Sequence, residues 1–121
     1  MANTFKVVTF AAEPASAGTA YKMYTVAGST TTVVLGLIVT NIHSAAVTVE
    51  VELHSDTGSR GGANDVTNGI SYLVKDVTIP AGSSLELLSG GKVVMETTDI
   101  LKIDCSVTDK VSGTLSIMEI T

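Results

Sequence analysis

The stretch from Val77 to Val107 joins short apolar runs through turn residues and has no helical period. Pro80 and Gly82 interrupt the chain after the first run, because proline fixes φ and glycine tolerates a positive φ. From Leu101 to Thr108, apolar and polar residues alternate with a period of two, which indicates a strand with one buried face. The stretch therefore predicts short strands joined by tight turns.

Similar runs recur along the whole chain, separated by Gly, Pro, Asn and Asp. Outside the opening stretch, the expected strands are Phe5–Phe10, Thr19–Val26, Thr30–Ile42, Val47–His54, Gly69–Ile79 and Val111–Ile120. Many short strands at regular spacing are typical of sandwiches and jelly rolls. We predict an all-β fold: a single, jelly-roll-like β-sandwich of about eight antiparallel strands.

The run from Thr30 to Ile42 is apolar on both faces, with Val33, Leu35, Leu37 and Val39 expected on one of them. Such a strand is either central and covered on both sides or in contact with another chain. A glycine at position 36, within this run, predicts a bulge or a close approach of backbones.

Composition adds a hint of assembly. Of the 121 residues, enough for one domain, 45% are apolar and 16% are charged, against roughly 25% charged residues in a typical soluble domain. We therefore expect another chain to cover part of the apolar surface, as in a homo-oligomer. The net charge of −5, with 7 basic residues, disfavours nucleic acid as a partner because phosphate binding needs clustered Lys and Arg.

The start of the sequence does not read as a signal peptide, and no apolar run approaches the roughly 18 residues of a membrane helix. We expect neither a membrane partner nor a cofactor. Cys105 is the single cysteine and lies on the apolar side of its expected strand, so we predict a small core residue.

Two segments are candidates for contacts with partners. Residues 1–18 are expected to be an N-terminal strand or arm, ahead of a β-sandwich domain at 19–121. Residues 55–68 form one long polar loop, and loops of that length are often functional. The candidate interaction residues of the arm and the loop are Phe5, Val7, Phe10, Arg60 and Asp65.

Residue chemistry offers little support for catalysis, and we predict that the chain is not an enzyme. Asp56-Thr57-Gly58-Ser59 has the letters of the aspartic-protease loop, but polar residues flank it where buried strands are needed. Asp56 and Asp65 match no dedicated calcium loop. His43 and His54 are the two histidines, and two imidazoles without further ligands do not make a zinc site.

A sugar-binding module is a further alternative, because many such modules are β-sandwiches. Sugars stack on exposed aromatic rings. The chain has no Trp, and Tyr21 and Tyr24 are expected on opposite faces of one strand, where they cannot form a platform.

Several blocks between Tyr21 and the C-terminus resemble small virion structural proteins of tailed bacteriophages. They are Met23–Gly28, Thr32–Leu37, Val39–Asn41, Tyr72–Lys75, Ile79–Leu85, Gly91–Val94, Asp99–Lys102 and Met118–Ile120. The resemblance implies a β-sandwich that decorates or cements the capsid, or else a tail, neck or fibre-base component. It implies the major capsid protein or other virion proteins as partners, a location in the virion after synthesis in the host cytoplasm, and no catalytic residue.

Overall fold

The computed structural model describes residues 2–57 and 62–121. These residues form strands and one 3-10 helix, η1 (Gly62–Asn64). The strands are β1 (Asn3–Glu13), β2 (Tyr21–Thr25), β3 (Thr31–Asn41), β4 (Val47–Thr57), β5 (Val66–Ile79), β6 (Ser84–Leu87), β7 (Val93–Met95), β8 (Ile100–Cys105) and β9 (Val111–Ile120). The prediction of an all-β chain is confirmed.

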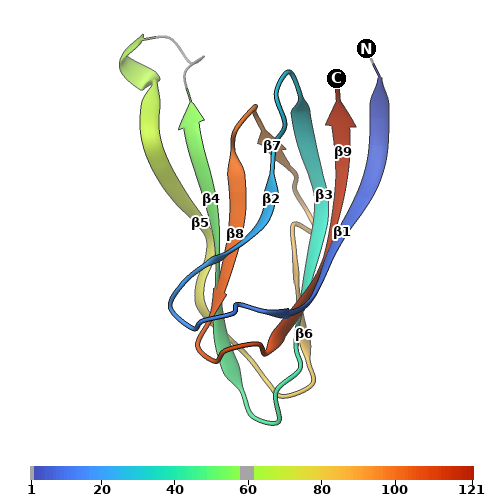
Figure 1. The fold of residues 1–121 in the computed structure, drawn as a ribbon, viewed down its shortest axis with the longest axis vertical. Helices are drawn as coiled ribbons and strands as arrows, with labels where there is room; N and C mark the ends of the chain where they lie inside the picture. Colours follow the sequence, from blue (N-terminus) through green and yellow to red (C-terminus); the bar gives the residue numbers. More distant parts are fainter. Residues whose placement is uncertain (1, 58–61) are drawn as a thin grey trace.

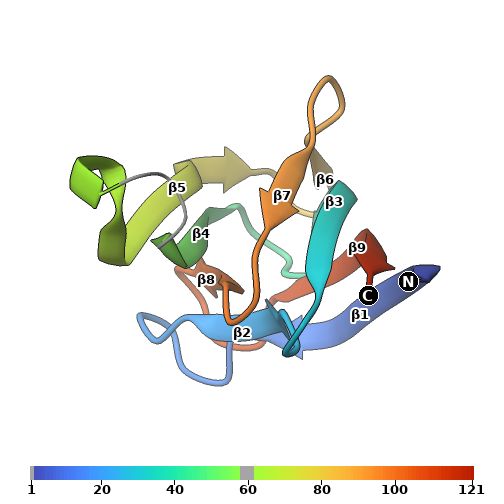
Figure 2. The same ribbon diagram turned by 90° about the horizontal axis from the view of Figure 1, so that it is seen from above.

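The strands form two antiparallel sheets packed face to face (Figure 1). The first sheet has the order β1-β9-β3-β6, and β7 also pairs with β3. The second sheet has the order β2-β8-β4-β5. Figure 2 shows the two layers from above, with β6 and β7 on the same side of β3. When β6 and β7 are counted as one interrupted strand, this is the double Greek key of a jelly roll, as predicted.

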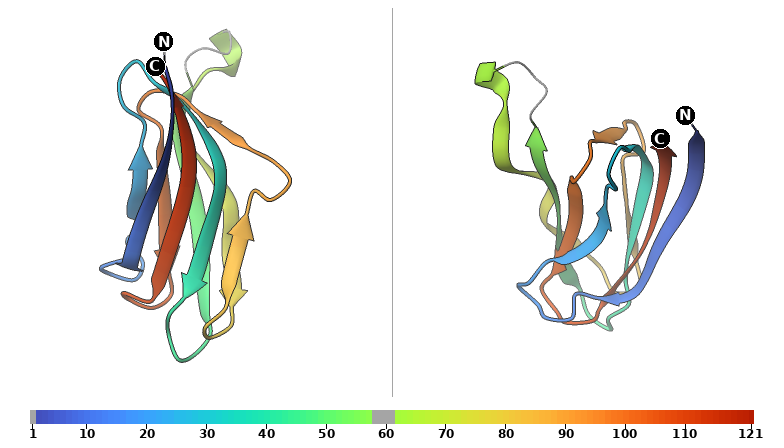
Figure 3. Two further views of the ribbon diagram at one scale, coloured as in Figure 1. Left: turned by 90° about the vertical axis from the view of Figure 1, so that its right-hand side faces the viewer. Right: turned by 45° about the horizontal axis from the view of Figure 1, so that its top comes forward.

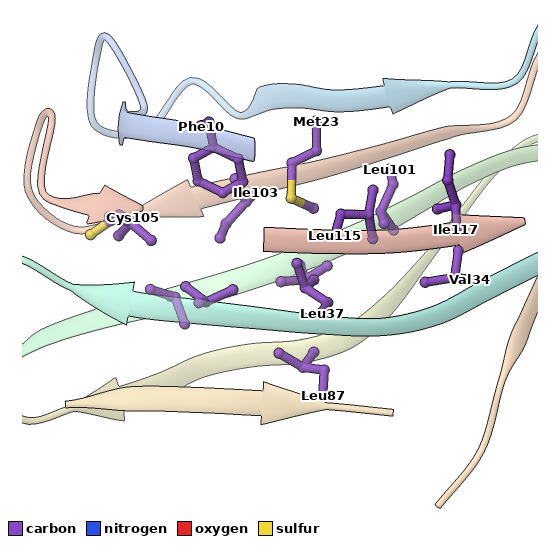
Figure 4. Packing of buried hydrophobic residues seen from close by; sticks show 14 of the residues in the cluster. Phe10, Met23, Val34, Leu37, Leu87, Leu101, Ile103, Cys105, Leu115 and Ile117 are labelled. Carbon is purple, nitrogen blue, oxygen red and sulfur yellow. The ribbon is translucent and has the colours of Figure 1, made fainter. Parts of the chain in front are cut away.

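The inner faces of both sheets supply the core. In β9, every second residue from Val111 to Ile117 is buried, and in β8 Leu101 and Ile103 are fully buried. This alternation places one face of each strand against the opposite sheet. Figure 4 shows Leu101, Ile103, Leu115 and Ile117 together with Cys105, which is 3% exposed. The prediction that Cys105 is a small core residue is confirmed.

A bulge divides β3 into two halves, as the glycine in its middle predicted. The register with β9 shifts between Val34 and Gly36. The extra residue reverses which side chains point inward, so Val34 and Leu37 are both fully buried. The expectation that Val33 and Leu37 share a face is therefore wrong, since Leu37 lies in the core and Val33 on the outer face.

The region predicted as a loop over residues 55–68 is shorter than expected. β4 continues to Thr57 and β5 begins at Val66, with these two residues paired across the hairpin. Polar composition suggested a loop, but a ladder of backbone hydrogen bonds forms whatever the side chains are. The two strands therefore extend as a hairpin, seen in Figure 1.

Candidate interaction surface

A row of apolar side chains crosses the outer face of the first sheet. The register aligns Phe5 of β1 with Met118 of β9, Met118 with Val33 of β3, and Val33 with Val94 of β7. Phe5 is 72% exposed and Val94 61%. The left view of Figure 3 faces this side of the molecule, with β1, β9 and β3 side by side. Four strands thus present one continuous apolar row to the outside.

Further apolar residues extend this row into a surface, which we call the apolar sheet face. It consists of Phe5, Val7, Val33, Leu35, Ile38, Val94 and Met118. The structure describes every strand of this sheet, and Glu86 of β6 is the one charged side chain that those strands direct outward. An open antiparallel sheet normally directs polar residues to solvent. Exposed apolar surface of this kind marks contacts with other molecules.

The outer face of the second sheet has the opposite character. Its central row aligns Lys22, Lys102, Glu52 and Tyr72 across all four strands. The Lys75 Nζ lies 2.9 Å from Glu50 Oε2 and 4.6 Å from the centroid of the Tyr72 ring. The hydrogen bond to Glu50 raises the pKa of Lys75 above its ordinary value. These charges make this face suited to water.

β1 is the edge of the first sheet that is best formed for pairing with another strand. It has 11 residues and stays in continuous register with β9 from Asn3 to Phe10. The other edges are less regular: β2 has 5 residues, β6 and β7 have 4 and 3, and β5 shifts register repeatedly against β4. Short or bulged edges resist pairing with other chains, whereas a long regular edge favours it.

A polar group joins the two sheets at one end of the core. The Tyr24 hydroxyl donates to Glu119 of β9 and lies 2.8 Å from the Thr32 hydroxyl of β3. Lys6 Nζ is 2.7 Å from Glu119 Oε1. Burial, followed by the bond to Glu119, raises the pKa of Tyr24 to about 12. The bonds from Lys6 and then Tyr24 lower the pKa of Glu119. Oppositely charged and neutral partners thus hold this carboxylate ionised between the sheets.

The inward position of Tyr24 corrects the sequence prediction. A bulge between Lys22 and Tyr24 in β2 changes the alternation. Tyr21, whose ring centroid is 5.3 Å from that of Phe10, and Tyr24 are both packed against the core rather than on opposite faces. Neither ring is free to form a sugar-stacking platform on the outside.

The structure separates the candidate interaction residues of β1. Phe5 and Val7 lie on the apolar sheet face. Phe10 is 7% exposed and belongs to the core, because its ring lies over Gly113, where an added Cβ would be 2.3 Å from Phe10 Cζ. Phe10 is therefore removed from the set of contact residues.

The loop candidates do not join Phe5 and Val7. Arg60 lies outside the described residues. Asp65 is exposed at the tip of the β4–β5 hairpin, which belongs to the second sheet (Figure 1). Sequence analysis missed Val33, Val94 and Met118, although strands that are apolar on both faces were the available signal.

The described residues give no support to catalytic or metal chemistry. Asp56 lies at the end of β4, and the rest of the protease-like motif extends into residues outside the described part. Among the side chains described, no group of three or more His, Cys, Asp or Glu is placed to hold a metal ion. No helix in residues 2–57 and 62–121 is long and apolar enough to cross a membrane.

Comparisons with known proteins inform the fold. No protein-family model and no curated protein matches the chain. The structure is similar to a chain in the crystal structure of the IBDV viral particle, with a TM-score of 0.53 and 11% sequence identity. The match covers 97% of this chain and 30% of that chain, so this chain spans under a third of the IBDV chain. The matched part of that chain shares the fold of this chain.

Proposed function

We propose that this chain is a structural protein of a bacteriophage virion, most specifically a decoration or cement protein that stabilises the head across capsid subunits. The observation that carries the proposal is the apolar sheet face. It is an outward surface of a jelly roll whose strands direct one charged side chain outward, whereas the other outward face carries charges of both signs, among them Lys102, Glu50 and Glu52. The similarity of fold to a chain of the IBDV viral particle supports the same class of role.

The size of the apolar sheet face suits a stable contact. The long strands β1, β9 and β3, about 4.8 Å apart and each with about ten residues rising about 3.3 Å, give the outer face of the first sheet about 500 Å² before β6, β7 and side-chain relief are counted. Specific interfaces remove about 800 Å² from solvent on each partner. The face is therefore of the size that one shell subunit or the junction between two would cover.

Copy number separates this proposal from its alternative, a tail, neck or fibre-base component. A decoration protein is present in hundreds of copies distributed over the head, whereas a ring component is present in a small fixed number at one vertex. An electron-microscopy map of the native phage particle, with this chain located in it, distinguishes the two roles.

A matched pair of substitutions tests the role of the apolar sheet face. Val94 on this face, which is 61% exposed, and Thr78 on the outer face of the second sheet are both exposed β-branched residues. We expect Val94→Lys to lower occupancy on undecorated heads by at least about tenfold, because a buried lysine without a partner is costly. Thr78→Lys should leave occupancy unchanged. Equal occupancy for the two variants, with both folded, would contradict the proposal.

A further inference from the structure

The backbone of β1 has one side that this chain leaves without a strand. The Ala2 amide donates to the Thr121 carbonyl, and the Thr121 amide donates to the Ala2 carbonyl. In an antiparallel pair, such doubly bonded residues alternate with residues whose backbone groups point away. With the register of β1 on β9, Thr4, Lys6 and Val8 face β9.

The alternate residues between Asn3 and Thr9 therefore face the open edge. They are Asn3, Phe5, Val7 and Thr9, and each presents an N–H and a C=O at that edge. Their side chains lie on the outer face of the first sheet, and none of the four is charged. The edge thus offers backbone hydrogen bonds next to the apolar sheet face.

We propose that β1 pairs antiparallel with β1 of a second copy of this chain, so that the first sheets of two molecules become one continuous sheet. This proposal deepens the proposed function and rests on it only for its biological setting, because a protein that covers a shell in many copies brings such edges together. Addition of a strand to a sheet edge is a common mode of recognition.

The open edge of β1 is a place where a second copy can bind without bringing like charges of the outer face together. Each molecule carries a net charge of −5, so two copies repel each other through most of their surfaces. The open edge of β1 brings no charged side chain of its outer face against its twin. The other regular surface, the outer face of the second sheet, would place Glu50 and Glu52 near like charges.

The register that we expect is centred on Val7. It places Val7 opposite Val7 of the other copy and Phe5 opposite Thr9, with about six new backbone hydrogen bonds. A register centred on Lys6 would pair all four edge residues, with about eight backbone hydrogen bonds. It would also place two lysines directly opposite each other, which is unfavourable, so we expect the Val7 register instead. In the Val7 register, each Phe5 lies diagonal to the other copy's Val7. Two side chains that are 72% and 64% exposed in one molecule thereby gain an apolar neighbour.

An edge contact of this kind buries less than the roughly 800 Å² per partner of standard interfaces. We therefore expect a weak, reversible dimer in the purified protein. Its dissociation constant should lie in the range of about tens to hundreds of micromolar. The apolar sheet faces of both copies stay on one side of the joined sheet and remain available to a shell.

Cysteine pairing tests the register in the purified full chain. Opposite residues of a doubly bonded pair have Cα atoms about 5.5 Å apart, within the range of a disulfide. Val7→Cys alone should form a dimer under mild oxidation. Phe5→Cys or Thr9→Cys alone should not, because their own twins lie about 13 Å away along the strand, whereas a mixture of these two variants should crosslink. Native Cys105 is buried, so the unmodified chain is the blank.

Proline substitution separates dimerisation from folding. Val7→Pro removes an N–H that faces the open edge, so the molecule should stay folded while its dimerisation weakens by at least about tenfold. Val8→Pro removes an N–H that faces β9 and should destabilise the fold. Sedimentation equilibrium gives the dimerisation constant, and circular dichroism reports the folded state.

The outcomes for this proposal and for the proposed function are distinct. A chain that stays monomeric at high concentration, or a crosslinking pattern without the Val7 pairing, overturns the joined sheet even if the protein decorates phage heads. A dimer with the expected pattern supports the joined sheet even if the protein never binds a head, in which case the proposed function falls instead.

Discussion

The two outer faces of this sandwich are built from strands of similar type, but they differ in charge. The second sheet directs a row of Lys22, Lys102, Glu52 and Tyr72 to solvent. The first sheet directs Phe5, Met118, Val33 and Val94 to the same solvent. Folding requires only that the inner faces be apolar, and the second sheet has the charged and polar outer side chains that are usual for a sheet face in contact with water. The first sheet departs from that pattern, and the partner that we propose would account for the departure.

The largest expected effect compares two phenylalanines of one strand. Phe10 points into the core and Phe5 points out of the apolar sheet face. We expect Phe10→Ala to lower the free energy of unfolding by about 3 kcal/mol, because it leaves a cavity. Phe5→Ala should change it by less than about 0.5 kcal/mol. Urea denaturation measures both. If both variants lost a similar free energy of unfolding, the apolar sheet face would contribute to folding stability, and its apolar side chains would need no partner to explain them.

A smaller effect concerns the charges of the first sheet that point inward. The pKa of Glu119 lies below its ordinary value of 4.5, first because of Lys6 and then because of Tyr24. Its contribution is present in full above pH 4.5 and is lost as the pH falls through the lowered pKa. We expect the loss to be at most about 1 kcal/mol, because the carboxylate is partly solvated.

Glu119→Gln is the control for this acid effect, since it keeps the shape and removes the titration. Thermal unfolding between pH 6 and pH 3 should show a shallower decline in the variant than in the parent protein. If the parent protein and the variant lost thermal stability equally as the pH fell, ionisation of Glu119 would contribute no more to stability than the exposed charges of the second sheet.

The smallest effect belongs to the charged face. Lys75 bonds to Glu50 and lies over Tyr72, but its side chain is 55% exposed. Exposed ion pairs of this kind contribute little, so Lys75→Ala should leave the midpoint of thermal unfolding and the occupancy on phage heads unchanged. A clear loss of either would give the second sheet a role in stability or binding that the comparison of the two faces denies it.

Local patterns in the sequence determine most of the strands. The alternation from Leu101 onward predicts β8, and the turn at Asp109 and Lys110 predicts the start of β9 at Val111. Gly36 predicts the bulge of β3. These features depend on neighbours along the chain, which a single sequence contains.

Features that depend on residues far apart in the chain could not be predicted from the sequence. β1 and β9 lie at opposite ends of the chain, and only their pairing places Phe5 beside Met118. The bulge in β2 has no glycine to mark it, so the inward turn of Tyr24 toward Glu119 gave no local signal. For the same reason, an apolar row made from four separate strands becomes visible only once the strands are ordered.

The bulge in β3 makes this strand intolerant of changes in length. With the extra residue in place, Leu37 and Val39 are fully buried and Ile38 is 44% exposed. Deleting Gly36 would rotate the following half of the strand by one step, sending Leu37 outward and Ile38 inward. Natural variation in this strand should therefore consist of substitutions, and insertions or deletions should accumulate in the connections between strands.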